Sequence, residues 1–208
     1  LKKQAGSFTD LSVGYLIKSD KRNRRFMPTD GHIISFKQNF PIYADSKSLL
    51  NSIRYSGYNS FSENFVGAFK IYGASITSLG DEDVRLSKRL HLGRSYLRGF
   101  ESGKVGPKDG TDYIGGNYAS AINFEAALPN LLPESTETDI SLFMDIANLW
   151  HVDYSSSVND SDKIRSSFGV ATNMYTPIGP LSFVIAQNLS KADTDVTQSF
   201  NFQIGTSF

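Results

Sequence analysis

The chain has 208 residues, contains no cysteine and carries 21 basic and 21 acidic side chains, so its formal net charge is zero. The missing cysteines exclude a disulfide scaffold and a thiolate metal site, and the balanced charge argues against a nucleic-acid partner. No segment approaches the roughly 18 apolar residues that a membrane-spanning helix needs, so any insertion into a membrane must use strands.

Apolar and polar residues alternate over segments of about ten residues, the length that a tilted strand needs to cross a bilayer. The alternation predicts about nine strands, near residues 9–20, 31–40, 48–59, 63–76, 115–128, 138–150, 164–176, 181–189 and 197–208. Turn-forming residues separate these strands, for example at 28–31 and 129–133. The fold class is therefore all-β. The first residue is not Met and no signal sequence precedes the first strand, which suggests a mature product or a fragment.

Each predicted strand has one apolar and one polar face. Charged residues near the middle of the strands fall on the polar face: Lys18, Lys37, Arg54, Lys70, Glu125 and Asp145. A barrel with a polar lumen would show this pattern, because a lipid-facing charge at mid-membrane costs about 2–4 kcal/mol. A soluble β-sandwich with one solvated face would show it as well, so both architectures remain open at this point.

The connection from about 77 to 114 is unusually long and rich in glycine and charge, which is typical of functional loops. If it folds back into a barrel, Arg98 enters a confined lumen and needs a carboxylate partner. Glu125 and Asp145 are the mid-strand acids on the inward face, and a guanidinium can bond two carboxylates at once. A solvated loop arginine is the alternative.

The sequence offers little for catalysis. The three histidines, His32, His91 and His151, lie in or beside predicted turns and lack a second ligand at metal spacing. No G-x-S-x-G motif occurs. Glu125 and Asp145 could form an acid–base pair, but an ion pair with Arg98 explains them better. We therefore expect no catalytic residues, no metal and no cofactor.

A series of motifs runs in a fixed order along the chain. The series begins with the loop motif Leu97, Arg98, Gly99 and Phe100. It continues through 106–109, 115–117, 124–125, Pro129, Asp145, Trp150 and 177–181 to the terminal segment 202–208. In order and spacing, the series resembles the BamA family of outer-membrane β-barrel assembly factors, and 26–31 resembles an earlier turn of that family. The resemblance covers nearly the whole chain, and Leu97 stands where the family more often has Val or Ile.

The resemblance implies a role for each of these sites. The 77–114 connection corresponds to the family's sixth extracellular loop, in which Arg98 pairs inside the lumen with Glu125 and Asp145 of the barrel wall. The last strand corresponds to the strand at the lateral seam. Its site residues are Phe202, Ile204, Gly205, where the family's strand bends, and Phe208, the terminal aromatic of the sorting signal.

By the same resemblance, residues 1–208 are the C-terminal part of a transmembrane antiparallel β-barrel, about nine strands of a sixteen-stranded barrel in the bacterial outer membrane. The implied function is insertion of other barrel proteins, without enzymatic activity. The implied partners are unfolded outer-membrane β-barrel proteins, accessory assembly lipoproteins and outer-membrane lipid. The alternatives are a TamA-type or two-partner-secretion translocation barrel, a passive outer-membrane pore and an outer-membrane hydrolase.

Overall fold

The computed structural model describes residues 7–129, 131–132, 138–153, 158–160, 162–176 and 179–204, without the side chains of Tyr175 and Pro180. Nine strands build one sheet: β1 (Asp10–Asp20), β2 (Gly31–Ala44), β3 (Ser48–Ser62), β4 (Phe65–Ser78), β7 (Tyr118–Ala127), β8 (Thr138–Trp150), β9 (Arg165–Thr176), β10 (Gly179–Ser190) and β11 (Phe200–Ile204). Among the described residues, no helix has the length and apolar character to cross a membrane.

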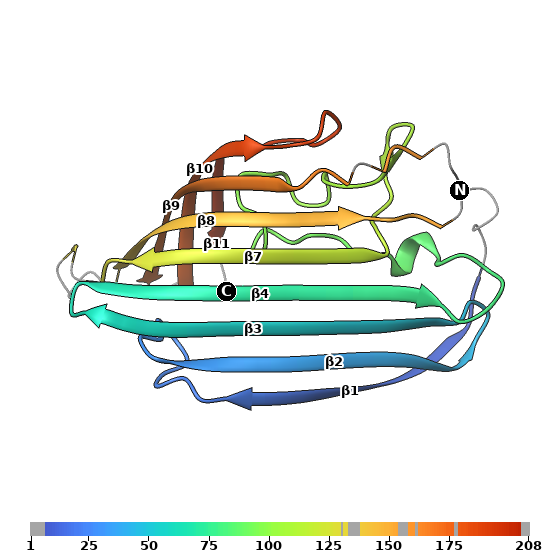
Figure 1. Cartoon of the computed structure of the whole chain (residues 1–208), viewed down its shortest axis with the longest axis horizontal. Coiled ribbons are helices and arrows are strands. Elements are labelled where there is room, and N and C mark those ends of the chain that lie inside the picture. Colours follow the sequence, from blue (N-terminus) through green and yellow to red (C-terminus); the bar gives the residue numbers. More distant parts are fainter. Residues whose placement is uncertain are drawn as a thin grey trace.

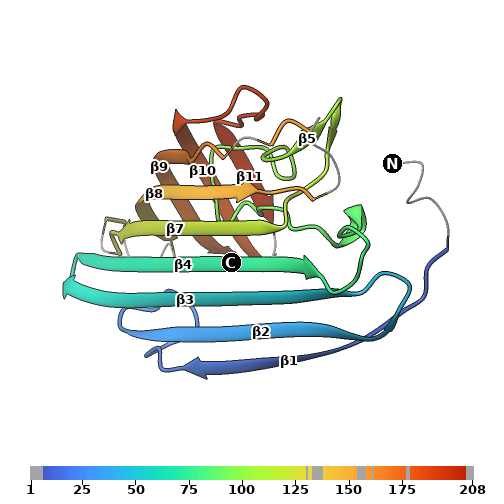
Figure 2. The same cartoon turned by 45° about the vertical axis from the view of Figure 1, so that its right-hand side comes forward.

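The strands follow one another in the sheet in chain order, and every neighbouring pair is antiparallel. Within the described residues, β1 and β11 are the two edges. Figure 1 shows the long strands side by side, and Figure 2 shows that β9, β10 and β11 curl away from the plane of β1 to β4. The sheet therefore has an inner, hollow side and an outer side.

The nine predicted strands are confirmed, and several of their bounds differ from the predicted ones, as in β2, which continues to Ala44, and β3, which continues to Ser62. β7 begins at Tyr118, three residues later than predicted, because Gly116 exchanges backbone hydrogen bonds of 2.9 and 3.0 Å with Leu90 of the long connection. The last strand is described as Phe200–Ile204, and residues 205–208 lie outside the described residues. Just before β7 and just before β11, the chain bonds to the long connection.

The period-two pattern sorts side chains onto two faces. In β8, Leu142 and Met144 are 51% and 40% exposed, whereas Phe143 and Asp145, which alternate with them, are 4% and 0% exposed. The same outward face on other strands carries further exposed large apolar side chains, among them Ile122, Phe124, Phe168, Val170, Ile185 and Phe202. An apolar band of this extent is typical of a sheet that faces lipid.

The core lies between the sheet and the connection of residues 79–117, which contains the 3-10 turn η2 (Leu86–Lys88) and the small hairpin β5 (Lys108–Asp109) and β6 (Asp112–Tyr113). Leu97 and Phe100 of this connection, both 3% exposed, pack in one cluster with Ala121, Ala147 and Leu149 of the sheet. A sandwich would bury its core between two large sheets. The single sheet and its loop-covered inner face therefore exclude the sandwich alternative.

Candidate functional site

Neighbouring strands place the two predicted acids on the inner face. Asn123 of β7 lies opposite Asp145 of β8, and Glu125 follows two residues along on the same face. Glu125 is thus the diagonal neighbour of Asp145, and such positions are about 7–8 Å apart. The spacing leaves room for one planar group between the two carboxylates.

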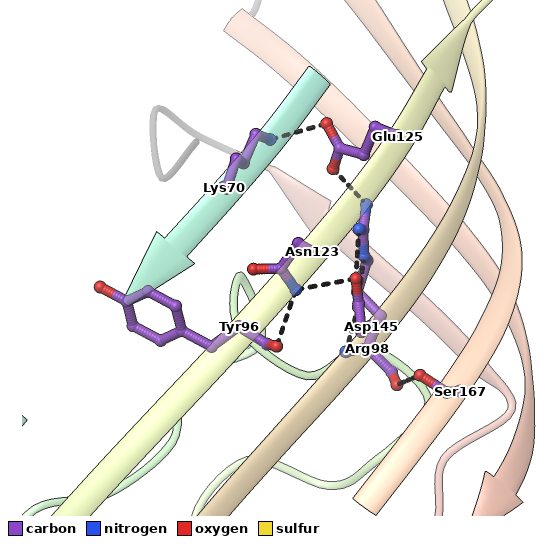
Figure 3. A network of polar contacts seen from close by, with 7 residues as sticks. All are labelled: Lys70, Tyr96, Arg98, Asn123, Glu125, Asp145 and Ser167. Carbon is purple, nitrogen blue, oxygen red and sulfur yellow. Dashed lines mark hydrogen bonds and ion pairs between the residues drawn. The ribbon is translucent and has the colours of Figure 1, made fainter. Parts of the chain in front are cut away.

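The guanidinium of Arg98 occupies this space (Figure 3). Its Nη1 lies 2.7 Å from Glu125 Oε1, and its Nη2 and Nε lie 2.6 and 2.8 Å from Asp145 Oδ1 and Oδ2. The backbone N–H of Arg98 also donates to Asp145 Oδ2 at 2.9 Å. Arg98 therefore bonds Asp145 through Nε, Nη2 and its backbone N–H, and it bonds Glu125 through Nη1.

The clamp formed by Arg98, Glu125 and Asp145 is shielded from water. The three side chains are 12%, 18% and 0% exposed, respectively. Burial by itself would lower the pKa of the Arg98 guanidinium, but the hydrogen bonds and charges of Asp145 and Glu125 outweigh burial and raise that pKa. The guanidinium also lies 3.8 Å from the ring centroid of Phe143, a cation–π contact.

Polar groups around the clamp complete its hydrogen bonding. Asn123 Nδ2 donates to Asp145 Oδ1 at 2.8 Å and to the Tyr96 carbonyl at 2.9 Å. The hydroxyl of Ser167 donates to the Arg98 carbonyl at 2.5 Å. Side chains of β7, β8 and β9 therefore hold both the charge and the backbone of the loop motif.

Lys70 joins this cluster, although the sequence analysis assigned it no partner. Its Nζ lies 2.6 Å from Glu125 Oε2, so the cluster contains two cations and two carboxylates. The alternation of apolar and polar residues along the strand predicted that Lys70 lies on the inward face. The pairing itself depends on the register that sets Lys70 opposite Asn123, and one sequence does not reveal that register.

Gly99 connects the loop motif to the last strands. Its carbonyl accepts hydrogen bonds from Asn188 Nδ2 of β10 at 2.9 Å and from the Gln198 backbone N–H at 3.0 Å. Its φ is +84°, and a Cβ would lie 3.0 Å from the Ala186 Cβ. Glycine is required here both for this backbone conformation and for the close approach.

The terminal residues lie apart from the clamp. Phe202 and Ile204 of β11 are 43% and 57% exposed on the outward face, and the Phe202 ring lies 4.9 Å from that of Phe183 on β10. Gly205 and Phe208 fall outside the described residues. The site therefore has two parts, a clamp on the inner wall and an edge strand.

The arrangement is suited to holding a loop in place. A cavity of about 740 Å³ borders the clamp and is lined partly by Arg94, Lys70, Asp139 and the turn around Met27. Across the part of the chain that the structure describes, no group of three or more His, Asp or Glu residues could hold a metal ion. The geometry fixes the loop through charge and hydrogen bonds.

Comparisons with known proteins give one family. The model for the Omp85 superfamily domain matches residues 1–208. Three relatives are each described as "Outer membrane protein assembly factor BamA". The protein from Neorickettsia risticii is 27% identical over 213 aligned positions, which cover 100% of this chain and 29% of that protein. The one from Neisseria meningitidis serogroup B is 31% identical over 143 positions, covering 56% of this chain and 18% of that protein. The one from Nitratidesulfovibrio vulgaris is 24% identical over 197 positions, covering 91% of this chain and 24% of that protein.

A solved structure is also similar. The crystal structure of BamA from Haemophilus ducreyi lacking POTRA domains 1–3 superposes with a TM-score of 0.82 at 27% identity, covering 93% of this chain and 41% of that one. Nearly all of this chain therefore has the same fold as the matching part of that barrel. It spans less than a third of the length of the curated relatives it matches.

Proposed function

The chain belongs to the Omp85 superfamily, and from this premise we propose that it acts in the bacterial outer membrane as the barrel of a BamA-type assembly factor. The observation that carries the proposal is the clamp, in which Arg98 of the long connection bonds Glu125 and Asp145 on the inner wall. Three curated relatives described as assembly factors support assembly over translocation.

The proposal assigns residues 1–208 to the C-terminal part of an outer-membrane barrel, with the 77–114 connection inside the lumen. The outward apolar band suits contact with lipid. The similarity to the solved barrel, of which this chain covers 41%, supports the assignment. Within the described residues, the outer sides of β1 and β11 are unpaired and available to further strands.

The proposed mechanism uses backbone pairing and no chemical step. Within the described residues, β11 is an edge strand that pairs with β10 at five positions. An edge strand presents unpaired N–H and C=O groups, which an incoming strand can join by β-augmentation. The proposed partners are unfolded outer-membrane β-barrel proteins and accessory assembly lipoproteins, and a locally thinned bilayer would ease insertion.

The clamp provides the test. We expect Arg98→Ala to slow insertion of an unfolded barrel protein into vesicles that contain the intact protein by at least about tenfold, which corresponds to about 1.4 kcal/mol. The reason is that the variant leaves Asp145 fully buried without its main cation. The measurement is the rate at which the client acquires protease resistance.

Arg94→Ala is the matched control. Arg94 belongs to the same loop, is exposed and makes no ion pair among the described residues. Its replacement should leave the insertion rate within about twofold of the parent, because a single exposed charge contributes little. An Arg98→Ala protein that inserts clients at the parent rate would contradict the proposed role of the clamp.

A further inference from the structure

A second charged pair lies on the inner side, away from the clamp. Arg165, the first residue of β9, places its Nε 2.9 Å and its Nη2 3.2 Å from the two carboxylate oxygens of Asp195, which lies in the connection between β10 and β11. Both side chains are 0% exposed. This pair is more deeply buried than the Arg98 clamp, so loss of either charge would leave the other uncompensated.

The Asp195 carboxylate joins three segments of the chain. It accepts hydrogen bonds from the Gly106 backbone N–H of the long connection at 3.3 Å and from the Ala192 backbone N–H at 2.7 Å. Arg165 in turn donates from Nη1 to Asn148 Oδ1 of β8 at 2.5 Å. The pair therefore ties the loop before β11 both to the sheet wall and to the long connection.

Backbone hydrogen bonds continue from this pair to the start of β11. Val196 donates to the Lys104 carbonyl at 3.0 Å and accepts from the Glu101 N–H at 2.9 Å, and Gln198 donates to the Gly99 carbonyl at 3.0 Å. Ser199, the residue before β11, accepts from the Ala186 N–H at 2.8 Å. Residues 195–199 are thus bonded to the long connection, and then to β10, up to the first residue of the edge strand.

We propose that Arg165 and Asp195 are positioning residues that fix residues 195–199 against the long connection and thereby set the register and order of the edge strand β11. This inference rests on the proposed function, in which β11 is the strand that meets incoming chains. Within the described residues, β11 pairs with β10 alone, at five positions, so its register depends on that one neighbour and on the chain that leads into the strand. The buried pair supplies such a constraint from outside the strand.

If Arg165 and Asp195 only stabilised the long connection, any other buried ion pair that anchors this connection would have the same effect on β11. Arg89 and Asp153 form such a pair, with Nη2 2.7 Å from Oδ1 and exposed fractions of 0% and 24%. This pair ties the beginning of the same connection to the segment after β8. Its two side chains bond each other and the backbone of Val84, so it serves as the matched control.

The test is amide hydrogen exchange in the intact protein, reconstituted in phospholipid vesicles. We expect Asp195→Asn to accelerate exchange in 198–204 at least about tenfold, while Asp153→Asn leaves that segment within about twofold of the parent. Arg165→Lys keeps the charge but loses the bidentate geometry, so it should give an intermediate acceleration and guards against a misfolded Asp195→Asn protein. Equal exchange of 198–204 in the parent and both variants would overturn the proposal, as would an equal effect of Asp153→Asn.

Client insertion, measured on the same vesicles, separates this inference from the function on which it rests. Faster exchange in 198–204 with an unchanged insertion rate would uphold the positioning role and contradict the role of β11 in assembly. Unchanged exchange in these variants, together with slow insertion by Arg98→Ala, would overturn the positioning role and leave the proposed function intact.

Discussion

At the scale of single residues, the two acids of the clamp are not equivalent. Asp145 is fully buried and accepts four hydrogen bonds, three from Arg98 and one from Asn123. Glu125 is 18% exposed and shares its charge with Lys70, which is 31% exposed and can reach water. Asp145 therefore depends on Arg98 more strongly than Glu125 does.

This difference predicts an order of effects. Asp145→Asn should lower the free energy of unfolding by about 3–5 kcal/mol, the usual cost of breaking a buried pair. Glu125→Gln should lower the free energy of unfolding clearly less, because Arg98 still forms its ion pair with Asp145. Adding Asp145→Asn to Arg98→Ala should cost less than the sum of the two single changes, since both remove one interaction. Urea unfolding of the intact protein in vesicles measures all four, and additive effects would show that the residues act separately.

A comparison of two glycines in the long connection distinguishes the effect of backbone conformation from that of close packing. Gly99 and Gly103 have similar φ angles of +84° and +76°, but a Cβ at Gly103 would meet nothing within 4 Å, whereas one at Gly99 would press on Ala186. We expect both Gly→Ala changes to cost about 1–2 kcal/mol for the left-handed backbone. Only Gly99→Ala should also accelerate protease nicking of the loop. Equal nicking of the two variants would mean that the close approach at Gly99 is unimportant.

At the scale of elements, period-two alternation was sufficient to predict all nine strands, because successive side chains of a strand point to opposite faces of the sheet. The alternation also placed Glu125 and Asp145 on the inner face. It could not predict that Gly116 pairs with Leu90 of the long connection, since that connection has no periodic pattern. The Arg165–Asp195 pair was missed for a related reason: Asp195 lies in a connection, where parity carries no information.

The outward face of β8 provides a test of membrane placement. Met144 lies near the middle of the strand and Ile140 near its beginning, and both point outward. In a bilayer, Met144→Arg should cost about 2–4 kcal/mol and Ile140→Arg about 0–1 kcal/mol, because the cost of an arginine falls toward the interface. Unfolding in vesicles measures this difference, and equal costs at the two positions would argue against a spanning strand.

At the scale of the whole molecule, the long connection acts as a brace across the inner side of the sheet. It is contacted by at least one side chain from each of six strands that are consecutive in the sheet: Arg54 of β3, Tyr72 of β4, Asn123 of β7, Asp145 of β8, Ser167 of β9 and Asn188 of β10. The rings of Tyr72 and Tyr96 stack at 4.0 Å, and Arg54 donates to the Tyr96 hydroxyl at 2.6 Å. Curvature of the wall and position of the loop are therefore coupled.

The same brace distinguishes an assembly barrel from a passive pore. A pore requires a continuous water-filled lumen, and solute passage depends on the groups that line it. Here Leu97 and Phe100 of the loop pack against Leu149 of the wall and occupy part of the inner side. In the proposed function incoming strands pair at an edge and do not pass through the lumen, so this occlusion is compatible with assembly, whereas it would lower the conductance of a pore.

We therefore expect the intact protein to show low conductance in a planar bilayer. Arg98→Ala should raise the conductance and make it fluctuate, because the loop loses its bonds to Asp145 and Glu125 and moves relative to the wall. Arg94→Ala, which removes an exposed charge from the same loop, should behave like the parent. A large, steady conductance in the parent that Arg98→Ala leaves unchanged would favour the passive pore, since the loop would then not control access to the lumen.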